Sequence, residues 1–593
     1  MTSLRTALAA VSCVSILALG ACATTPPAPS GDQSANAPPL VRADVSTYGL
    51  FLAASKAYNN GDMGDAADLF AAAARREDGE PALLQRAFKA ALIAGDVHKA
   101  ATLAPPLVAP TPIAGGSTLL AYDEATTLGW LGRLTQAVDA IADGRGREAQ
   151  ALLTTPPLRG QVATAGVLLT PWAAAAAGDW KTALAEPVAR GDRMNDEIAE
   201  LSHAMLLERR HRFDDADAAY RKIVAEADGS SLYTNAYGAF LERRGRRADA
   251  TALYKTAIQA DAGSHALPAA LARVEAGKPA PAEMTIAQGA AQTLLGPTVL
   301  FLQQKQPMGL AYLRLVLRLD PGRDEAWVLV GDVLAPEDPS GAREAYSHPQ
   351  PGSPEFIDSR ARLITTYDGD ASANPVVLQI AQDTVKGAPG DDDALTLLAD
   401  ALRVNEQYAA SAKVLDKLIA DLGDRATWQL YYMRGVALEQ AGQWPAAEAD
   451  MQKALTLSPD EPEVLNYLGY SWIDRGVHLR EAKAMIEKAV AAKPDSGAIA
   501  DSLGWAYFRL GDYKKAVDQL EHASELDAAD PDVNNHLGDA YWRAGRRTEA
   551  RFQWERVLTL NPSAKLRGEA ESKLKGGLDG PNRVAEATTA ATR

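Results

Sequence analysis

Residues 501–511, DSLGWAYFRLG, decide the fold, because their pattern returns at a fixed distance along the chain. The first glycine of this stretch, Gly504, has three counterparts at equivalent positions. We call the four residues the marker glycines, and they are separated by 34, 35 and 34 residues. They are Gly435, Gly469, Gly504 and Gly538. A regular spacing of this size indicates a structure built from repeated units.

Other residue types keep fixed distances from the marker glycines. A second glycine follows seven residues later and suits a helix end, where a residue with positive φ is needed. An alanine comes next, where two helices cross closely, and a large apolar residue lies four positions beyond it. The three sets are Gly442, Gly476, Gly511 and Gly545; Ala447, Ala482, Ala516 and Ala550; and Met451, Ile486, Leu520 and Trp554. This pattern is typical of the 34-residue tetratricopeptide repeat, a pair of helices.

The same pattern extends upstream with less regularity. Gly238, Gly245 and Tyr254 match in order, and Gly331 marks another unit. We expect about 12 helix pairs. Segments rich in proline and glycine are predicted to be elongated connections, and they are 105–116, 277–281, 336–354 and 387–390. The predicted parts are N-terminal helical repeats at 45–300, irregular middle repeats at 301–390 and a C-terminal array with a capping helix at 391–575.

The predicted fold class is therefore all-α, an α-solenoid of tetratricopeptide repeats. Each unit would stack on its neighbour, which gives a right-handed superhelix with one continuous core. Residues 563–575 would cover the end of the stack with a stripe of Leu566, Ala570 and Leu574, while charged residues such as Lys573 face water. The tail at 576–593 is rich in glycine, alanine and threonine, and we expect it to be disordered.

The N-terminus resembles a bacterial lipoprotein signal. Residues 1–21 carry Arg5 and an apolar stretch that is too short for a permanent transmembrane helix. The last three of these residues and the next form the sequence Leu19-Gly20-Ala21-Cys22. This lipobox implies that the Cys22 thiol receives a diacylglyceryl group, that the chain is cut before Cys22 and that the new amine is acylated. Two or more acyl chains anchor a protein stably. The alternative is an ordinary secretory signal with a chance cysteine.

Residues 22–44 are rich in proline, alanine and serine and would form a tether. Ala23 stands where enteric lipoproteins carry the aspartate that signals retention in the inner membrane. We therefore expect the protein to be lipid-anchored in the outer membrane and to face the periplasm.

Composition and motifs argue against several function classes. Cys13 leaves with the signal, so the mature chain has no disulfide, cysteine metal site or second thiol. The formal charge of -16 argues against nucleic acid as a partner. The eight histidines form no metal-binding motif and are interpreted as solvated or capping residues, and no nucleophile elbow, phosphate loop or dinucleotide fingerprint occurs. We predict a protein that is not an enzyme, with no catalytic residue, cofactor or metal.

Acidic runs have a structural interpretation. Asp391, Asp392 and Asp393, and likewise Asp214 and Asp215, are predicted to lie at helix starts, where carboxylates interact favourably with the helix dipole. Calcium binding is the alternative.

The repeat register predicts a partner-binding groove in the C-terminal array. Residues three before, one after and four after each marker glycine would point into it. The groove residues that we select are Tyr432, Asn466, Tyr470, Asp501, Trp505, Phe508, Asn535, Asp539 and Trp542. Exposed aromatic clusters usually mark an interface, and the asparagines could bond an extended backbone. The alternative is that a loop or linker of this chain fills the groove, or that helix packing buries the rings.

A family resemblance follows from the C-terminal repeats. The stretches 464–470 (VLNYLGY), 474–477 (DRGV), 501–511 and 536–542 (HLGDAYW) resemble the last repeats of outer-membrane tetratricopeptide-repeat lipoproteins of the LbcA type. The resemblance implies an adaptor for a PDZ-containing carboxyl-terminal processing protease that degrades peptidoglycan cross-link hydrolases. The alternative function is a scaffold for envelope or peptidoglycan machinery that involves no protease.

Overall fold

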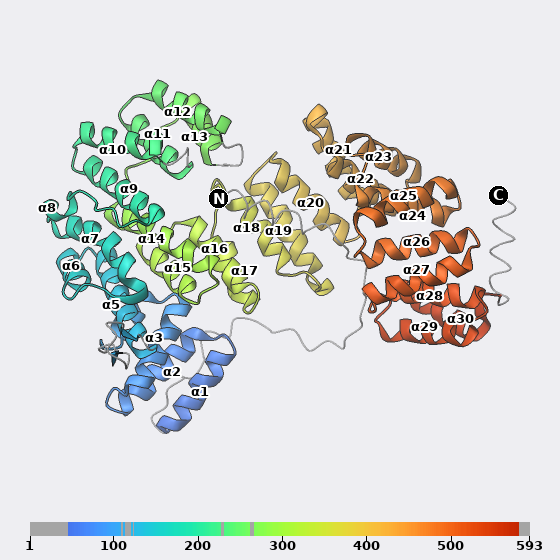
Figure 1. Ribbon diagram of the computed structural model, residues 1–593, viewed down its shortest axis with the longest axis horizontal. Coiled ribbons are helices and arrows are strands. Elements are labelled where there is room, and N and C mark those ends of the chain that lie inside the picture. The colour runs from blue at the N-terminus through green and yellow to red at the C-terminus, as the bar shows by residue number, and fades with distance from the viewer. Residues whose placement is uncertain are drawn as a thin grey trace. The chain divides into compact units, whose positions relative to one another are not determined.

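The structure, a computed structural model, describes residues 45–107, 111–112, 120–121, 124–226, 231–260 and 266–579. Thirty α-helices lie in these residues (Figure 1), which confirms the all-α fold class. The predicted signal, Cys22 and the tether lie outside the described residues. The described chain divides into two units, with the boundary in the sequence between residues 366 and 367, so the predicted middle segment 301–390 contributes to both.

The N-terminal unit contains eighteen of the thirty described helices, and thirty is more than the predicted count of about 12 helix pairs implies. Its helices are α1 (Thr47–Asn59), α2 (Met63–Arg76), α3 (Pro81–Ala94), α4 (Val97–Thr102), α5 (Glu124–Ala142), α6 (Gly146–Thr154), α7 (Ala163–Ala177), α8 (Trp180–Ala183), α9 (Arg193–Arg209), α10 (Phe213–Glu226), α11 (Ser231–Arg243), α12 (Arg247–Ala260), α13 (Ala266–Glu275), α14 (Ile286–Gln303), α15 (Met308–Leu319), α16 (Asp324–Leu334), α17 (Pro339–Ser347) and α18 (Phe356–Thr365). A 3-10 turn, η2 (Gly160–Val162), and two short antiparallel strands, β1 (Thr111–Pro112) and β2 (Leu120–Ala121), complete it. Because α17 lies within 336–354, the prediction that this segment is an elongated connection is wrong.

The C-terminal unit contains the remaining twelve helices. They are α19 (Asn374–Gly387), α20 (Asp392–Val404), α21 (Tyr408–Leu422), α22 (Trp428–Gln440), α23 (Trp444–Leu457), α24 (Pro462–Arg475), α25 (Leu479–Ala492), α26 (Gly497–Arg509), α27 (Tyr513–Leu526), α28 (Pro531–Arg543), α29 (Arg547–Thr559) and α30 (Ala564–Gly576), with 3-10 turns η3 (Ala371–Ala373), η4 (Gly423–Arg425) and η5 (Gly577–Asp579). None of the described helices in either unit is long and apolar enough to span a bilayer.

The marker glycines allow the helices of each pair in the C-terminal unit to approach closely. A Cβ atom on Gly504 would lie 2.5 Å from the side chain of Leu520, and one on Gly538 would lie 2.5 Å from the ring of Trp554. Neither contact is sterically possible without movement of the partner. The predicted alanines and the large residues after them are fully buried, and the second glycines have φ values between 72° and 83°. The repeat pattern read from the sequence is therefore confirmed.

Two of the acidic runs begin helices as predicted. Asp391 caps α20 by accepting hydrogen bonds from the backbone N–H groups of Asp393 and Ala394. Asp214 and Asp215 lie in the first turn of α10. Both arrangements place carboxylates at the positive end of a helix dipole.

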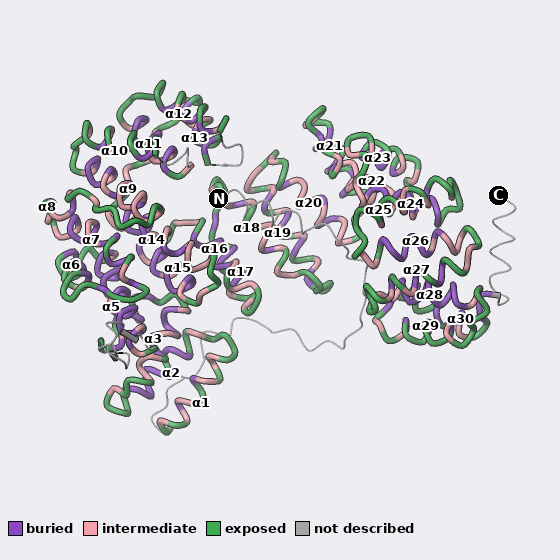
Figure 2. Tube along the Cα trace, viewed as in Figure 1, coloured by how far each residue is buried: buried purple, intermediate pink, exposed green. Residues whose placement is uncertain are grey.

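The N-terminal unit departs from a stack in which each pair contacts only its neighbours. The chain passes through α10–α13 and then returns, so that α14 packs on α7 and α9, and α15 packs on α3 and α5. The Trp172 Nε1–H donates to Thr293 Oγ1 at 2.8 Å across 121 residues of sequence. Gly289 allows this approach, because a Cβ there would lie 2.0 Å from the Trp172 ring. One core therefore joins helices α1–α7 with α14–α17, and most helices are buried along one side (Figure 2).

Carboxylate groups tie successive helices of the N-terminal unit together. Each accepts hydrogen bonds from a tyrosine hydroxyl of the following helix and from an arginine of the helix after that. The three sets are Glu208 with Tyr220 and Arg243, Glu242 with Tyr254 and Arg273, and Asp332 with Tyr346 and Arg362. Buried polar groups of this kind are stable only when they are satisfied, and here each carboxylate links three helices.

The end of the C-terminal unit differs from its prediction in one residue. Leu566 and Ala570 of α30 are buried as expected, but Lys573 is buried too, with a side chain only 2% exposed. The prediction that Lys573 faces water is wrong. The ordered chain also continues past residue 575, because η5 follows α30 directly and Leu578 is buried. Residues 580–593 of the predicted tail lie outside the described residues.

Candidate partner-binding groove

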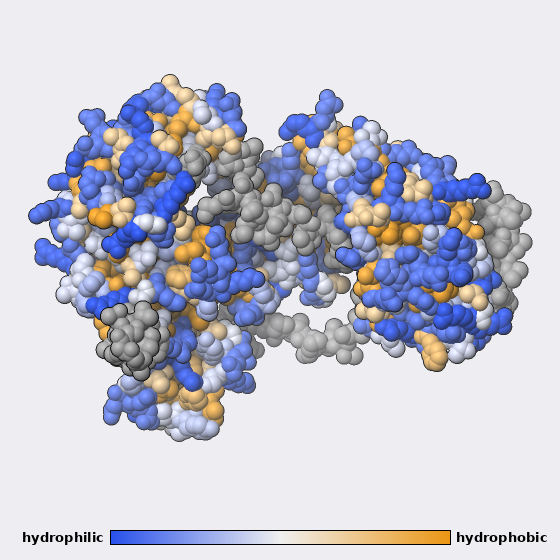
Figure 3. Space-filling model, in the orientation of Figure 1, coloured by the Kyte–Doolittle hydropathy of each residue, from blue (hydrophilic) through white to orange (hydrophobic). Residues whose placement is uncertain are grey.

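The predicted groove residues lie on four helices, α22, α24, α26 and α28. The helix α24 packs against α26 and α26 packs against α28, while Tyr432 of α22 contacts Tyr467 of α24 through their rings. Tyr432, Asn466 and Tyr470 are half-buried, and so are Trp505 and Phe508. Hydrophobic residues interrupt the hydrophilic surface of the C-terminal unit over α24–α26 (Figure 3). Five of the nine predicted groove residues are therefore partly exposed, and of these Tyr432 and Trp505 pack against the core.

Aromatic rings are stacked on α26 and α28. The Trp505 ring lies between the Phe508 ring, at a centroid distance of 4.7 Å, and the His536 imidazole, at 4.2 Å. Both neighbours are nearly parallel to the indole, at interplanar angles of 8° and 18°. Tyr470 approaches His536 from α24 with its centroid 6.5 Å away. We call Phe508, Trp505 and His536 the ring stack. Stacked aromatic side chains are held in place before a ligand arrives, so they lose little conformational entropy when the ligand binds.

A buried ion pair fixes the ring stack in place. His536 Nδ1 lies 2.9 Å from a carboxylate oxygen of Asp501, and both side chains are 9% exposed. Burial lowers the pKa of His536, but the charge of Asp501, the hydrogen bond to it and the charges of Asp532 and Asp539 outweigh burial and raise the pKa above its ordinary value. The histidine therefore favours the cationic form, and it links α26 to α28.

Burial raises the pKa of two neighbouring groups as well. Desolvation is the main cause that raises the pKa of Asp532, and it likewise raises the pKa of the Tyr470 hydroxyl. Two buried polar atoms of groove residues have no hydrogen-bond partner in the part of the chain that the structure describes, namely Asn466 Oδ1 and Trp505 Nε1. Unsatisfied buried groups of this kind are uncommon and often mark functional surfaces.

The last repeat is occupied by the chain itself. Lys573 Nζ donates to Asn535 Oδ1 at 2.7 Å and lies 2.8 Å from Asp539 Oδ2, while Trp554 Nε1 donates to Asp539 Oδ1 at 3.0 Å. The backbone at Gly577 lies against the Trp542 ring, since a Cβ there would be 2.0 Å from it. These contacts place Asn535, Asp539 and Trp542, which were predicted to line the groove, against α30 and η5 of the same chain.

The predicted groove residues thus fall into two groups. Tyr432, Asn466, Tyr470, Trp505 and Phe508 remain half-buried at groove positions. The other four, Asp501, Asn535, Asp539 and Trp542, contact His536, Lys573 or η5.

Sequence reasoning missed His536, which is buried in the packing of α26 and α28 and does not cap a helix or face solvent. Its spacing could have revealed it, because His536 lies 35 residues after Asp501, one repeat of 34 residues plus one, so the two residues occupy adjacent helices of the same series.

A small recess opens where the ring stack meets η5. Its volume is about 260 Å³, and its lining residues are Trp505, Phe508, Arg509, Tyr513, Asp539, Arg543 and Leu578. The recess combines an aromatic floor with two arginine side chains.

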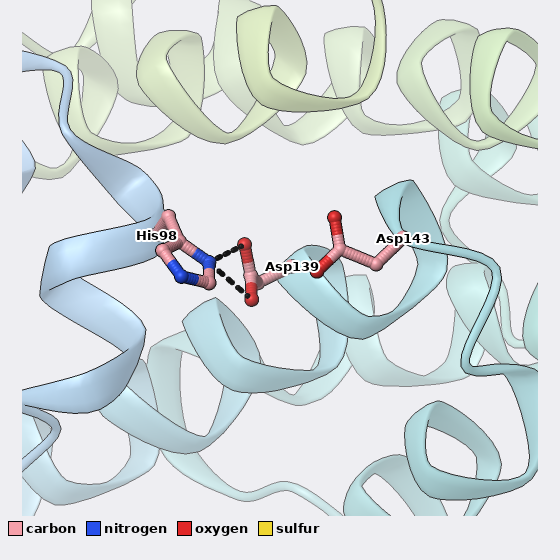
Figure 4. Close-up of side chains that lie close together, drawn as sticks. All are labelled: His98, Asp139 and Asp143. Carbon is pink, nitrogen blue, oxygen red and sulfur yellow. Dashed lines mark hydrogen bonds and ion pairs between the residues drawn. The ribbon is translucent and has the colours of Figure 1, made fainter.

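One group of possible metal ligands occurs in the described residues, in the N-terminal unit. His98 on α4 faces Asp139 on α5 at 3.2 Å, and Asp143 lies directly after the end of α5 (Figure 4). Arg145 Nη2 lies 2.8 Å from Asp139 Oδ2, and Arg318 Nε lies 2.9 Å from Asp139 Oδ1. These guanidinium groups already occupy both oxygens of the buried carboxylate. The cluster is an ion-pair network that joins α4 and α5 to α15.

Two protein-family models match the C-terminal unit. The model described as tetratricopeptide repeat matches residues 396–462 and 432–497, and the model described as TPR repeat matches residues 504–545. The C-terminal unit is built from tetratricopeptide repeats. Arrays of such repeats expose extended surfaces that bind peptide or protein partners. No curated protein matches the chain.

Several solved structures are similar to the chain. One is the Cut9–Hcn1 hetero-tetramer of the APC/C, with 15% identity over 84% of this chain and 96% of that chain, and a TM-score of 0.36. A tetratricopeptide repeat protein from Parabacteroides merdae is 14% identical over 42% of this chain and 97% of that chain, with a TM-score of 0.36. YrrB, described as a TPR protein with an unusual peptide-binding site, is 17% identical over 32% of this chain and 97% of that chain, with a TM-score of 0.26.

Proposed function

We propose that this protein is a non-catalytic adaptor of tetratricopeptide repeats, anchored in the outer membrane through Cys22 and facing the periplasm. It binds a PDZ-containing carboxyl-terminal processing protease and brings cell-wall hydrolases to it as substrates. The alternative is a scaffold for envelope or peptidoglycan machinery without a protease. The lipobox-like sequence at Cys22 and the resemblance of the C-terminal repeats to those of LbcA-type lipoproteins support the first proposal.

The observation that carries the proposal of partner binding is the set of half-buried aromatic side chains on the groove helices. Tyr432 packs edge-on against Tyr467 at a centroid distance of 5.7 Å, and Phe508 stacks on Trp505. Both rings keep part of their surface exposed. Rigid aromatic residues in such positions are the usual anchors of protein interfaces, because they bury a large area for a small loss of entropy.

Affinity capture from detergent-solubilised envelopes tests the proposal. Lipidated wild-type bait should retain a periplasmic protease together with a cell-wall hydrolase. Replacement of Tyr432 and Phe508 by alanine should weaken retention at least tenfold, since an anchoring aromatic contributes about 2 kcal/mol or more. The matched control is Phe552→Ala on α29, because this residue is 64% exposed and lies on a helix outside the groove series. Retention of other envelope proteins without a protease would favour the alternative.

The lipid anchor has its own prediction. Cys22→Ala should block lipid attachment and leave an unprocessed precursor, because the thiol is the acceptor of the diacylglyceryl group. Metabolic labelling with a fatty-acid analogue measures attachment, and membrane fractionation measures sorting. Labelling of the Cys22→Ala protein, or recovery of the wild type with the inner membrane, would contradict the assignment.

A further inference from the structure

Exposed basic side chains gather at one edge of the N-terminal unit. Helices α9–α13 pack around a core of their own and lie together in Figure 1. The ends of α9, α11 and α13 lead into turns in which nearly every described residue is exposed. We call the exposed cations of these turns the basic edge, and they are Arg210, Arg212, Arg244, Arg246, Arg247 and Lys278. The edge reverses the sign of the charge locally in a chain whose formal charge is -16.

Three of these cations occupy equivalent positions in successive units. Arg210, Arg244 and Lys278 are separated by 34 residues each, which is the repeat period. The turn after α11 touches the end of α13, because the Arg247 Nη2–H donates to the backbone oxygen of Lys278 at 3.5 Å. It also touches the start of α10, where Arg244 lies over the Phe213 ring. The three cations therefore form a row along the edge, which we call the cation row.

The cation row has no anionic partner in the part of the chain that the structure describes. Two other arginines of the basic edge differ in this respect. Arg212 lies 2.7 Å from Asp215, and Arg246 lies 2.8 Å from Asp249. Asp214 is exposed in the first of these turns, but it is a single negative charge beside the three positive charges of the row. The basic edge therefore keeps a positive charge that can attract an anion.

Aromatic rings hold two members of the cation row in place. The guanidinium carbon of Arg210 lies 5.2 Å from the centroid of the Trp180 ring, and that of Arg244 lies 3.8 Å from the centroid of the Phe213 ring. A guanidinium group that packs by its face on a ring keeps its N–H donors at the rim of its plane, where they can donate to an anion. These two arginines are thus positioned before a ligand arrives.

We propose that the cation row binds the phosphate groups of anionic lipids, so that the basic edge rests on the bilayer that holds the acyl chains of Cys22. The proposal rests on the lipid anchor of the proposed function, and it adds which edge of the N-terminal unit is turned to the membrane. Charge-assisted hydrogen bonds from guanidinium groups to phosphate oxygens are strong and often bidentate. At low salt, three cations at an anionic lipid surface strengthen its contact with a protein by on the order of a hundredfold.

A lipid surface fits the basic edge better than an acidic protein partner does. Protein interfaces need apolar anchors, and within the described residues of α9–α13 only Leu232 is a well-exposed large apolar side chain. Leu232 lies in the first turn of α11, at the opposite end of that helix from Arg244. The lipid anchor also keeps the bilayer at a high effective concentration. Because the whole chain carries a formal charge of -16, an anionic surface repels most of the protein and attracts this edge.

Energy transfer from the basic edge to the lipid headgroups tests the proposal. The lipidated full chain carries a donor fluorophore on Ala248→Cys, an exposed position beside the cation row, and acylation of Cys22 leaves the new thiol as the one that reacts. The vesicles contain a headgroup-labelled acceptor in phosphatidylcholine, with or without phosphatidylglycerol. Transfer should be at least twofold more efficient with phosphatidylglycerol at about 0.1 M salt. The difference should vanish at about 1 M salt, where the Debye length falls to about 3 Å.

Two triple variants with the same change of charge complete the test. Arg210→Gln, Arg244→Gln and Lys278→Gln together should reduce transfer in the anionic vesicles to the level of the neutral ones. The matched control, with exposed cations of the C-terminal unit replaced, should behave as the wild type does, and its substitutions are Arg480→Gln, Lys488→Gln and Lys514→Gln.

The outcomes separate this proposal from the anchor on which it rests. Equal transfer in the two kinds of vesicle, or in the wild type and the cation-row variant, would overturn the binding of lipid by this edge. Loss of a captured envelope protein in that variant, with energy transfer unchanged, would assign the edge to an acidic protein instead. If the wild type carries no acyl chain, the anchor is wrong, and co-sedimentation of the unlipidated protein with phosphatidylglycerol vesicles decides the edge. Binding that the cation-row variant loses would support it, and absence of binding would reject it.

Discussion

Replacement of Lys573 by methionine tests how the end of the C-terminal unit is held. Methionine keeps most of the apolar stem but removes the ammonium group, which now donates to Asn535 and pairs with Asp539 in a site only 2% exposed. Asp539 would keep one donor, the indole N–H of Trp554. Loss of one member of a buried ion pair costs about 3–5 kcal/mol, because the remaining charge is buried without compensation.

Hydrogen exchange measured by mass spectrometry reports this cost locally, which matters in a chain of two units where a single melting temperature is not well defined. Amides of α30 and of the end of α28 should exchange about a hundredfold faster or more in Lys573→Met, since each 1.4 kcal/mol is about a factor of ten. Lys575→Met, at an exposed position of the same helix, is the matched control. The double variant Lys573→Met with Asp539→Asn should recover most of the protection. Exchange in Lys573→Met within about threefold of the wild type would refute the reasoning.

Two further predictions concern the same array. Because the pKa of His536 is raised in the folded state, the stability from its pair with Asp501 is complete below about pH 6.5 and is lost as the pH rises through the folded pKa. The protection factors of amides in α26 and α28 should therefore fall with rising pH. In His536→Gln this pH dependence should be weaker. Gly504→Ala places a Cβ 2.5 Å from Leu520 and should destabilise the α26–α27 pair by about 1–3 kcal/mol in the same assay, whereas Gly568→Ala in α30, where a Cβ meets nothing within 4 Å, should be neutral or mildly stabilising. Protection factors in α26 and α28 that stay constant as the pH rises, or a Gly504→Ala protein as protected as the wild type, would contradict these predictions.

The C-terminal array was predictable because its rules are local and steric. Close helix crossing requires glycine at Gly538 and alanine at Ala550, and positive φ requires glycine at Gly545, so the 34-residue period is visible in residue types alone. The return of α14 onto α7 in the N-terminal unit was not predictable. It depends on the contact between Trp172 and Thr293, and a single sequence contains no periodic indication that residues 121 positions apart will meet.

The groove was predictable in position but not in its internal pairing. The register identifies Asp501, Asp539 and Trp542 as groove positions, and they do lie on α26 and α28. Whether such a side chain is free depends on what the next helix brings to it. His536 is supplied by the following repeat, and Lys573 by a helix that belongs to no complete repeat. The charge of Lys573 and the amphipathic pattern of its helix predicted a position in solvent, because neither shows that Asn535 and Asp539 lie beside it as buried partners.

Site-specific photo-crosslinking in intact envelopes tests the central claim that these aromatic groove residues bind a protein partner. Benzoylphenylalanine incorporated at position 508, in the ring stack, should give a discrete high-mass adduct of the protein. The same group at position 552, on an exposed face of α29, should give none. Identification of the adduct by mass spectrometry should show a periplasmic protease or its substrate. Adducts of equal yield at both positions, or an adduct at 552 alone, would contradict the assignment of this surface.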